Sequence, residues 1–368
     1  MGKRDDSLKK IYLFFCILLL ALGIYFYPVW KHHVPFLQWI PITEENSISS
    51  IKELEEIVIQ DLKQGKKEHS LYISKSLVEK MKNINENLDG YYGHVKSYHS
   101  SKITLKERVQ VKLKYQLSDN YYAYEYLKNG LDIKKQKNAL LLAKKAQSII
   151  KKIIKPNMTD YEKEKAIHDY IVKNGTYGFI KGKQKGWSYE SKGILLKGKG
   201  VCSSYAEAMQ LLLSLVDVES KIVIGKADID HSWNLVKINK MWYHVDTTWD
   251  DPVPDKKDRV LYHYFNIPDK WIEKSHEWKR EYYEPATSYE ENYYVKQNLW
   301  CKNYEETKLK INQAVQNKEN KITLFLTDRK AKKYTYNFIL QQENVRSVRW
   351  KYSGESPCLL LEISVTYR

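Results

Sequence analysis

The sequence predicts an α+β protein whose central domain packs a cysteine-bearing helix against an antiparallel sheet. A glycine-rich turn, Gly198 to Gly200, leads into a helical apolar pattern that begins near Cys202. Two alternating strands then meet at the turn-prone pair Asn239-Lys240, which predicts a β-hairpin. Mixed helix and strand patterns lie on both sides, so small α/β modules are expected to flank this centre.

Composition indicates a folded protein with a basic surface. Charged residues make up 29% of the chain and aromatic residues 13%, a balance that argues against a disordered chain. The net charge of +16 either reflects a lysine-rich soluble surface or gives affinity for anionic lipid or an anionic cell-wall polymer. No arginine-rich stripe interleaved with aromatic residues is visible, so a nucleic-acid partner is not expected.

The N-terminus carries an apolar segment long enough to cross a membrane. Residues 11–30 contain no charge, and as a helix they would span about 30 Å, the thickness of a bilayer core. Basic residues in segment 1–10 predict a cytosolic tail, and no small-residue cleavage site follows the apolar run. We therefore expect a single-pass anchor in the cell membrane, a juxtamembrane linker at 31–46, and an extracellular ectodomain.

Two regions outside the centre show the same order of patterns. Residues 47–135 form the first module, and residues 301–368 form the second. In the first, the pattern predicts helix 48–64, strand 69–74, helix 76–87, and strands 93–97 and 108–117. In the second, it predicts helix 304–317, strand 321–326, helix 329–342, and strands 345–352 and 358–367. The shared order suggests a repeated α/β module without chemistry of its own.

The central domain, residues 136–290, opens with two helices. An amphipathic helix over 137–155 ends at Pro156, because proline cannot continue a helix. Thr159 and Glu162 then have the spacing of a capping box, which predicts a second helix over 160–174.

Cys202 is the candidate nucleophile of this domain. At the start of a helix, the positive end of the helix dipole favours the thiolate, which is the reactive form of cysteine. Ser204 and Glu207 also have capping-box spacing, which would start the helix two residues later and weaken this field. For a cysteine considered alone, a buried packing role is the alternative.

The hairpin supplies two candidate partners, His231 and Asp246. With an even-length loop at Asn239-Lys240, His231 faces Thr248 across the hairpin, and Asp246 lies diagonally on the same face as His231. A carboxylate there can accept the imidazole N–H and stabilise the imidazolium. An odd-length loop would put the two side chains on opposite faces.

These motifs resemble a known family. The segments GVCSSYAEA, HSWNLVKINKMWYHVDTTWDDP and YHYFNIP are similar to those of the transglutaminase-like branch of the papain-type superfamily, above all its bacterial extracellular members. Ser232 stands where those members have alanine, and Ser203-Ser204 replaces a pair that ends in glycine. The resemblance covers about residues 158–280 and implies that Cys202 is the nucleophile, His231 the general base and Asp246 the orienting carboxylate.

The resemblance also implies a substrate cleft beside Cys202. The segment between residues 177 and 199 is expected to form one wall, although a solvated loop is the alternative. The aromatic residues expected to contact substrate are Trp187, Tyr189, Tyr205, Trp233 and Trp249, and the two tryptophans at 233 and 249 are otherwise core.

Other candidate residues rank lower. Asp250 is an alternative orienting carboxylate, His276 is a second histidine without an assigned carboxylate, and His168 fits a structural role on a helix. No cysteine or histidine stands at ligand spacing from Cys202, so neither a metal nor another cofactor is expected. Cys301 and Cys358 either form a disulfide outside the cell or remain free, because spacing alone does not decide.

Two functions remain open at this stage. In the first, the Cys202–His231–Asp246 triad transfers an acyl group from a protein or peptide amide to water or to an amine. In the second, the same fold is a catalytically silent surface module that binds cell-wall polymer, peptide or a partner protein.

Overall fold

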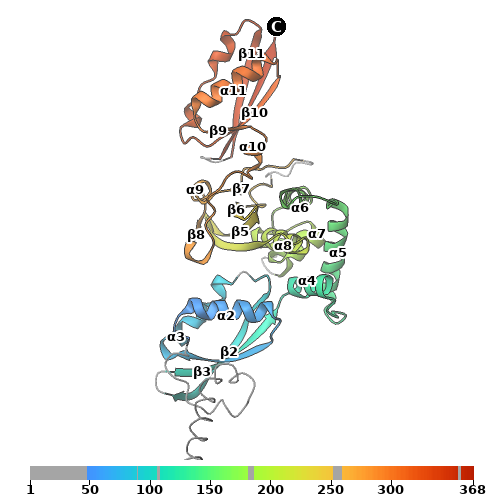
Figure 1. The fold of residues 1–368 in the computed structure, drawn as a ribbon, viewed down its shortest axis with the longest axis vertical. Coiled ribbons are helices and arrows are strands. Elements are labelled where there is room, and N and C mark those ends of the chain that lie inside the picture. The colour runs from blue at the N-terminus through green and yellow to red at the C-terminus, as the bar shows by residue number, and fades with distance from the viewer. Residues whose placement is uncertain (1–47, 89, 106–107, 181–185, 252–258, 355–357) are drawn as a thin grey trace, which may run out of the picture. The chain divides into compact units, whose positions relative to one another are not determined.

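The computed structural model describes residues 48–368 except 89, 106–107, 181–185, 252–258 and 355–357 (Figure 1). The expected anchor at 11–30 lies outside the described residues. Within the described part of the chain, none of the helices combines the length and the apolar character that crossing a bilayer requires. The described residues divide into two compact units: the smaller takes those within 48–54, 70–82 and 98–112, and the larger takes those within 55–69, 83–97 and 113–368.

The N-terminal module contains three strands and short helical segments. Its elements are α2 (Ile51–Lys63), β1 (Glu68–Ser74), α3 (Lys75–Lys80), the 3₁₀ segment η3 (Met81–Asn87), β2 (Gly93–Leu105) and β3 (Arg108–Leu117). The strand order is β1-β3-β2. Alternate residues of β3 from Val109 to Tyr115 are buried, as a strand with one covered face requires. The predicted helix over 76–87 is therefore a short α-helix followed by a 3₁₀ segment.

The central domain has a helical layer on one side of a five-stranded sheet (Figure 1). The helical elements are α5 (Lys137–Ile153), α6 (Asp160–Asn174), η5 (Gly186–Tyr189), α7 (Ser191–Lys197) and α8 (Cys202–Leu215). Helix α4 (Asp119–Asn129) lies within residues 47–135, the expected first module, but packs against α5 and α8. The predicted capping box at the start of α6 is confirmed, with both reciprocal hydrogen bonds between Thr159 and Glu162. Helix α8 packs against β4 and β5, and most of its residues are buried.

The sheet of this domain carries the predicted hairpin. Its strands are β4 (Ser220–Ala227), β5 (Ile229–Ile238), β6 (Met241–Val245), β7 (Phe265–Ile267) and β8 (Glu277–Trp278), in the order β7-β6-β5-β4-β8. All neighbouring pairs are antiparallel. Asn239 and Lys240 have φ values of 50° and 69°, as expected for a two-residue type I′ turn. The even-loop register is confirmed because Ile238 pairs with Met241, although β6 ends at Val245 and not at 249 as predicted.

The rest of the chain joins the central domain to the C-terminal module. The joining elements are α9 (Asp269–Ile272), η6 (Arg280–Tyr282) and α10 (Tyr293–Lys296). The module contains β9 (Trp300–Cys301), α11 (Tyr304–Gln316), β10 (Lys321–Leu326), η7 (Ala331–Lys333), η8 (Asn337–Gln341), β11 (Val345–Ser353) and β12 (Leu359–Tyr367). Its strand order is β11-β12-β10-β9.

The predicted helix over 329–342 is wrong. The chain instead forms two short 3₁₀ segments, η7 and η8. Tertiary contacts explain the difference: Tyr352 donates to the Ala331 carbonyl at 2.8 Å, and the hydroxyls of Tyr336 and Tyr352 lie 2.9 Å apart. The Ala331 carbonyl is therefore engaged by a side chain, whereas a continuous helix would use it for a backbone hydrogen bond of its own.

The two modules share an arrangement of strands. In each, the last strand in sequence (β3 or β12) lies between the two strands that precede it in the chain, so the similarity of pattern extends to topology. Cys301 and Cys358 are both buried free thiols, so the disulfide alternative does not hold in this structure.

Candidate active site

Cys202 is the first residue of α8, directly after the N-cap residue Val201. Its backbone N–H therefore has no acceptor within the helix, and its side chain lies at the positive end of the helix dipole. The capping-box reading of Ser204 and Glu207 is wrong, because both side chains have tertiary partners. Ser204 donates to the Glu190 carbonyl at 2.5 Å, and Glu207 accepts the backbone N–H of Ser191 at 3.0 Å.

A glycine lets the segment before Cys202 pass close to the helix. A Cβ on Gly200 would lie 2.5 Å from Cβ and Oγ of Ser204, so a side chain there would displace the first turn of α8. Gly200 also exchanges backbone hydrogen bonds with Thr176 and Gly178. Tyr177 is thereby fixed next to the segment that delivers the cysteine.

The hairpin delivers His231 from β5 and Asp246 from the residue after β6. His231 Nε2 lies 2.7 Å from Asp246 Oδ2, and both residues are buried. The second carboxylate oxygen, Oδ1, accepts the backbone N–H groups of Thr248 at 2.9 Å and Trp249 at 3.1 Å. Because the carboxylate holds Nε2, the other ring nitrogen of His231, Nδ1, is the one available to Cys202.

The electrostatics of the three groups favour a charged pair. Burial opposes ionisation of the Cys202 thiol, but its interaction with His231 and hydrogen bonds from Ser232 outweigh burial and lower its pKa. Burial would likewise lower the pKa of His231, but the charge and hydrogen bond of Asp246, together with Cys202, raise it to about 10. The same contacts hold the pKa of Asp246 below its ordinary value despite complete burial. These contacts shift Cys202 towards the thiolate and keep His231 in its imidazolium form at neutral pH.

His276 forms a second contact with the same carboxylate. Its Nε2 lies 3.0 Å from Asp246 Oδ2, and its Nδ1 lies 2.8 Å from the hydroxyl of Ser275. The ring is buried between Trp233 and Trp249, with ring centroids 4.9 Å and 4.7 Å away. Asp246 thus accepts hydrogen bonds from two imidazoles, which the sequence reasoning missed because it found no strand partner for His276.

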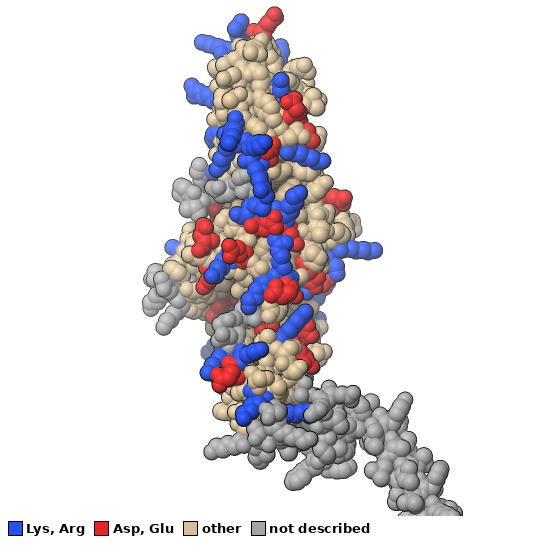
Figure 2. Space-filling view, turned by 90° about the vertical axis from the view of Figure 1, so that its left-hand side faces the viewer, with Lys and Arg blue, Asp and Glu red and all other residues tan. Residues whose placement is uncertain are grey.

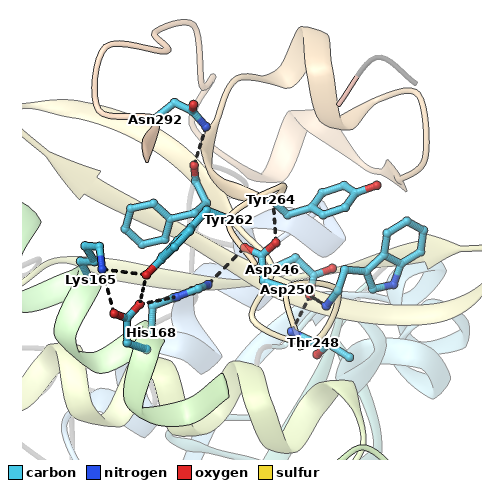
Figure 3. A network of polar contacts seen from close by, with 11 residues as sticks. Lys165, His168, Asp246, Thr248, Asp250, Tyr262, Tyr264 and Asn292 are labelled. Carbon is cyan, nitrogen blue, oxygen red and sulfur yellow. Dashed lines mark hydrogen bonds and ion pairs between the residues drawn. The ribbon is translucent and has the colours of Figure 1, made fainter. Parts of the chain in front are cut away.

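A further buried network lies behind the turn that carries Asp246 (Figure 3). Helix α6 supplies His168, whose Nε2 lies 3.1 Å from Asp250 Oδ2, and Asp250 in turn accepts the backbone N–H of Tyr264 at 3.0 Å. Tyr264 also accepts the backbone N–H of Asp246 at 3.0 Å. Asp250 therefore pairs with His168 and not with His231. Its contacts fix the turn that carries Asp246.

A pocket of about 660 Å³ opens beside the triad and is lined in part by Tyr177, His231 and Trp249. Of the other aromatic residues expected to contact substrate, Tyr205 and Trp233 are buried in the core and do not line this pocket. Trp187 and Tyr189 lie outside its walls on η5, where Trp187 contacts the ammonium groups of Lys192 and Lys197.

His231, Asp246 and His276 also form a group of potential metal ligands, with their ligand atoms within 4.8 Å of one another. Both nitrogens, however, lie at hydrogen-bond distance from one carboxylate oxygen, at 2.7 and 3.0 Å. Ligand atoms around a tetrahedral zinc ion at 2.0–2.2 Å would stand roughly 3.3 Å apart. Shared protons account for these spacings better than a common metal ion.

The comparisons with known proteins give a family match to the central part of the chain. The family model described as transglutaminase-like superfamily matches residues 147–247, a segment that contains Cys202, His231 and Asp246. This part of the chain belongs to the transglutaminase-like superfamily. No curated protein matches the sequence.

Three solved structures show weak overall similarity to this chain. One is a transglutaminase, 13% identical with a TM-score of 0.26, covering 49% of this chain and 50% of its own. The second, assigned as a cysteine protease from Cytophaga hutchinsonii, is 12% identical with a TM-score of 0.26, covering 53% of this chain and 70% of its own. The third, assigned as a protease from Parabacteroides distasonis, is 9% identical with a TM-score of 0.23, covering 81% of this chain and 65% of its own.

Proposed function

We propose that this protein is a cysteine-dependent acyl transferase or hydrolase that acts on amides of proteins or peptides. One observation carries the proposal: Cys202 begins a helix beside His231, whose remote nitrogen is held by a buried, ionised Asp246. This arrangement gives a nucleophile, a proton carrier and an orienting group at one point.

The chemistry follows from the charges of these groups. The Cys202 thiolate attacks the amide carbon, and the His231 imidazolium gives its proton to the nitrogen as the carbon–nitrogen bond breaks. The amine leaves and a thioester remains on Cys202. Water or a second amine then attacks the thioester while His231 takes its proton, which releases the acid or the new amide and restores the thiolate.

We propose two groups as hydrogen-bond donors to the oxyanion of this reaction. The first is the backbone N–H of Cys202, which as the first helical N–H has no acceptor within α8. The second is the hydroxyl of Tyr177, which lines the pocket with His231. Burial and then the nearby Cys202 raise its pKa, so the hydroxyl keeps its proton for donation.

We also propose that residues 11–30 anchor the protein in the cell membrane with the triad outside. The uncharged run and the basic residues before it support this topology. Fractionation should find the full chain in membranes, and protease added to intact cells should degrade the ectodomain. Recovery of the full chain in the soluble fraction would contradict the anchor.

An anionic cell-wall polymer is a further candidate partner because of the net charge of +16. On the face shown in Figure 2, basic and acidic side chains are interspersed, so attraction to such a polymer would act through the overall field and weaken with salt.

The direct test is detection of the acyl-enzyme and its products. Purified protein is incubated with glutamine-containing peptides, with and without a primary amine, and analysed by mass spectrometry against Cys202→Ala. We expect a thioester on Cys202 and a product of hydrolysis or amine addition, both absent from the variant. Product formation that survives Cys202→Ala would overturn the proposal.

A further inference from the structure

We propose that the pocket beside the triad contains a subsite for a carboxylate of the substrate, formed by Arg259, His263 and Ser353. The inference rests on the proposed function in one respect, because it takes this pocket as the place where substrate binds. All three residues line the pocket together with His231.

His263 is the first indication of a missing ligand. Its side chain is only 2% exposed, yet its Nε2 has no hydrogen-bond partner among the described residues. Burial, and then the charge of Arg259, lower the pKa of His263 to about 4, so the ring is neutral at physiological pH. A buried polar atom without a partner destabilises the empty pocket, and a ligand that pairs with it would remove this penalty.

Ser353 and Arg259 add two more polar groups to the same place. The buried hydroxyl oxygen of Ser353, at the end of β11, also lacks a partner within the described chain. Gly354 brings this segment close to the histidine, because a Cβ there would lie 3.4 Å from His263 Cε1 and Nε2. Arg259 is half-buried, and its guanidinium makes no ion pair with any residue that the structure describes.

The chemistry of these groups selects an acceptor with negative charge. The Arg259 guanidinium and the Ser353 hydroxyl donate hydrogen bonds, and His263 donates from Nε2 in one of its neutral tautomers. A carboxylate accepts from all three and matches the charge of the guanidinium. An ammonium group would be repelled by the Arg259 guanidinium, and a neutral amine would not balance its charge.

Among the described residues, no acidic side chain forms an ion pair with the Arg259 guanidinium. Asp251 accepts the Tyr205 hydroxyl at 2.5 Å, and Glu362 pairs with Lys351 at 3.0 Å. Asp228 also lines the pocket, but its side chain is exposed to solvent. A pocket of about 660 Å³ is in the range of small-ligand sites, so it has room for an acidic side chain next to the reacting amide.

The test measures binding separately from catalysis. The Cys202→Ala protein is titrated with blocked alanine pentapeptides that carry a central glutamine, with glutamate or glutamine at each other position in turn. We expect at least one glutamate peptide to bind about tenfold more tightly than its glutamine counterpart, a typical effect of one charge-assisted hydrogen bond. Because no acyl transfer occurs in this variant, the result does not depend on catalysis.

Matched variants identify the subsite. Arg259→Gln should abolish the preference for glutamate, and Ser353→Ala should reduce it about threefold. Lys226→Gln removes the same charge from an exposed position outside the pocket and should leave the preference intact. Equal affinity for all paired peptides, no measurable binding of either series, or a preference that persists in Arg259→Gln would overturn the subsite. Thiol labelling of the wild-type protein reports separately on the triad.

Discussion

At the scale of residues, the charge of Cys202 depends on its contacts with His231 and Ser232. Burial opposes a thiolate at this position, and only the contacts with His231 and Ser232 reverse that effect. His231 in turn keeps its proton because a buried carboxylate faces Nε2 at 2.7 Å. The charge on the Cys202 sulfur therefore depends on two linked contacts, one between Asp246 and His231 and one between His231 and Cys202.

The first prediction concerns the pH dependence of alkylation at Cys202. In the wild-type protein, iodoacetamide labelling should reach its plateau well below the ordinary thiol pKa of ~8.5, and acyl transfer should decline near pH 10 as His231 loses its proton. His231→Ala should move the labelling midpoint upward and slow labelling at pH 6.5 by about tenfold.

Mass spectrometry of the labelled peptide provides the internal control. Cys301 and Cys358 are buried, and burial raises the pKa of the Cys301 thiol to about 11, so neither should label in the folded protein. A labelling profile that His231→Ala leaves unchanged would contradict the coupling of thiol and imidazole.

The second prediction concerns His276 as a positioning residue for Asp246. Its hydrogen bond helps to lower the pKa of Asp246, so His276→Phe should raise that pKa and move the acid limb of the pH–rate profile upward. His276→Gln can still donate from the position of Nε2 and should restore most of the profile. A purely structural role would reduce the rate of both variants without moving the limb.

At the scale of elements, α6 and the turn after β6 act as one unit. His168 and Asp250 are both fully buried and lie 3.1 Å apart. The pKa of His168 is raised to about 9: burial alone would lower it, but hydrogen bonds and charge from Asp169 and Asp250 outweigh burial. The helix thus stabilises, by one contact, the turn that carries Asp246.

The third prediction is a stability test of this contact. His168→Phe leaves the Asp250 carboxylate buried without its partner, so we expect a loss of about 3–5 kcal/mol in the free energy of unfolding. The double variant His168→Phe, Asp250→Asn removes both charges and should lose less than the single variant. Denaturant unfolding at pH 7 measures both, and a double variant that is less stable than the single one would contradict this account.

The sequence predicted the hairpin correctly but not the residues that contact it from distant parts of the chain. The parity of the loop at Asn239-Lys240 was enough to place His231 and Asp246 on one face, because strand geometry is local. His276 and His168 approach Asp246 and Asp250 from elements 30 and 82 residues away, and no local pattern encodes such contacts. The capping-box reading of Ser204 and Glu207 failed for the same reason, since tertiary partners took both side chains.

At the scale of the whole molecule, the C-terminal module contributes to two apolar clusters. One lies within the module and includes Ile311, Leu324 and Leu361. The other includes Phe325, which is fully buried and stacks on Tyr294 with ring centroids 4.6 Å apart. The central domain and this module therefore share part of their buried surface.

The fourth prediction concerns that shared cluster. Phe325→Ala should lower the unfolding free energy by about 3–5 kcal/mol and separate one unfolding transition into two, because it removes a contact shared by both parts. Ile322→Ala, within the module's own cluster, should destabilise the module without loosening the central domain. Calorimetry distinguishes the effect of Phe325→Ala from that of Ile322→Ala. Identical thermograms for the two variants would contradict a shared cluster.

The two left-handed residues at the tip of the β5–β6 hairpin limit which length variants can retain activity. Inserting or deleting a single residue at 239–240 would shift the pairing by one and turn Asp246 to the opposite side of the sheet from His231. Related sequences that keep the chemistry should therefore differ at this tip only by even numbers of residues. Odd differences would mark relatives that have lost it.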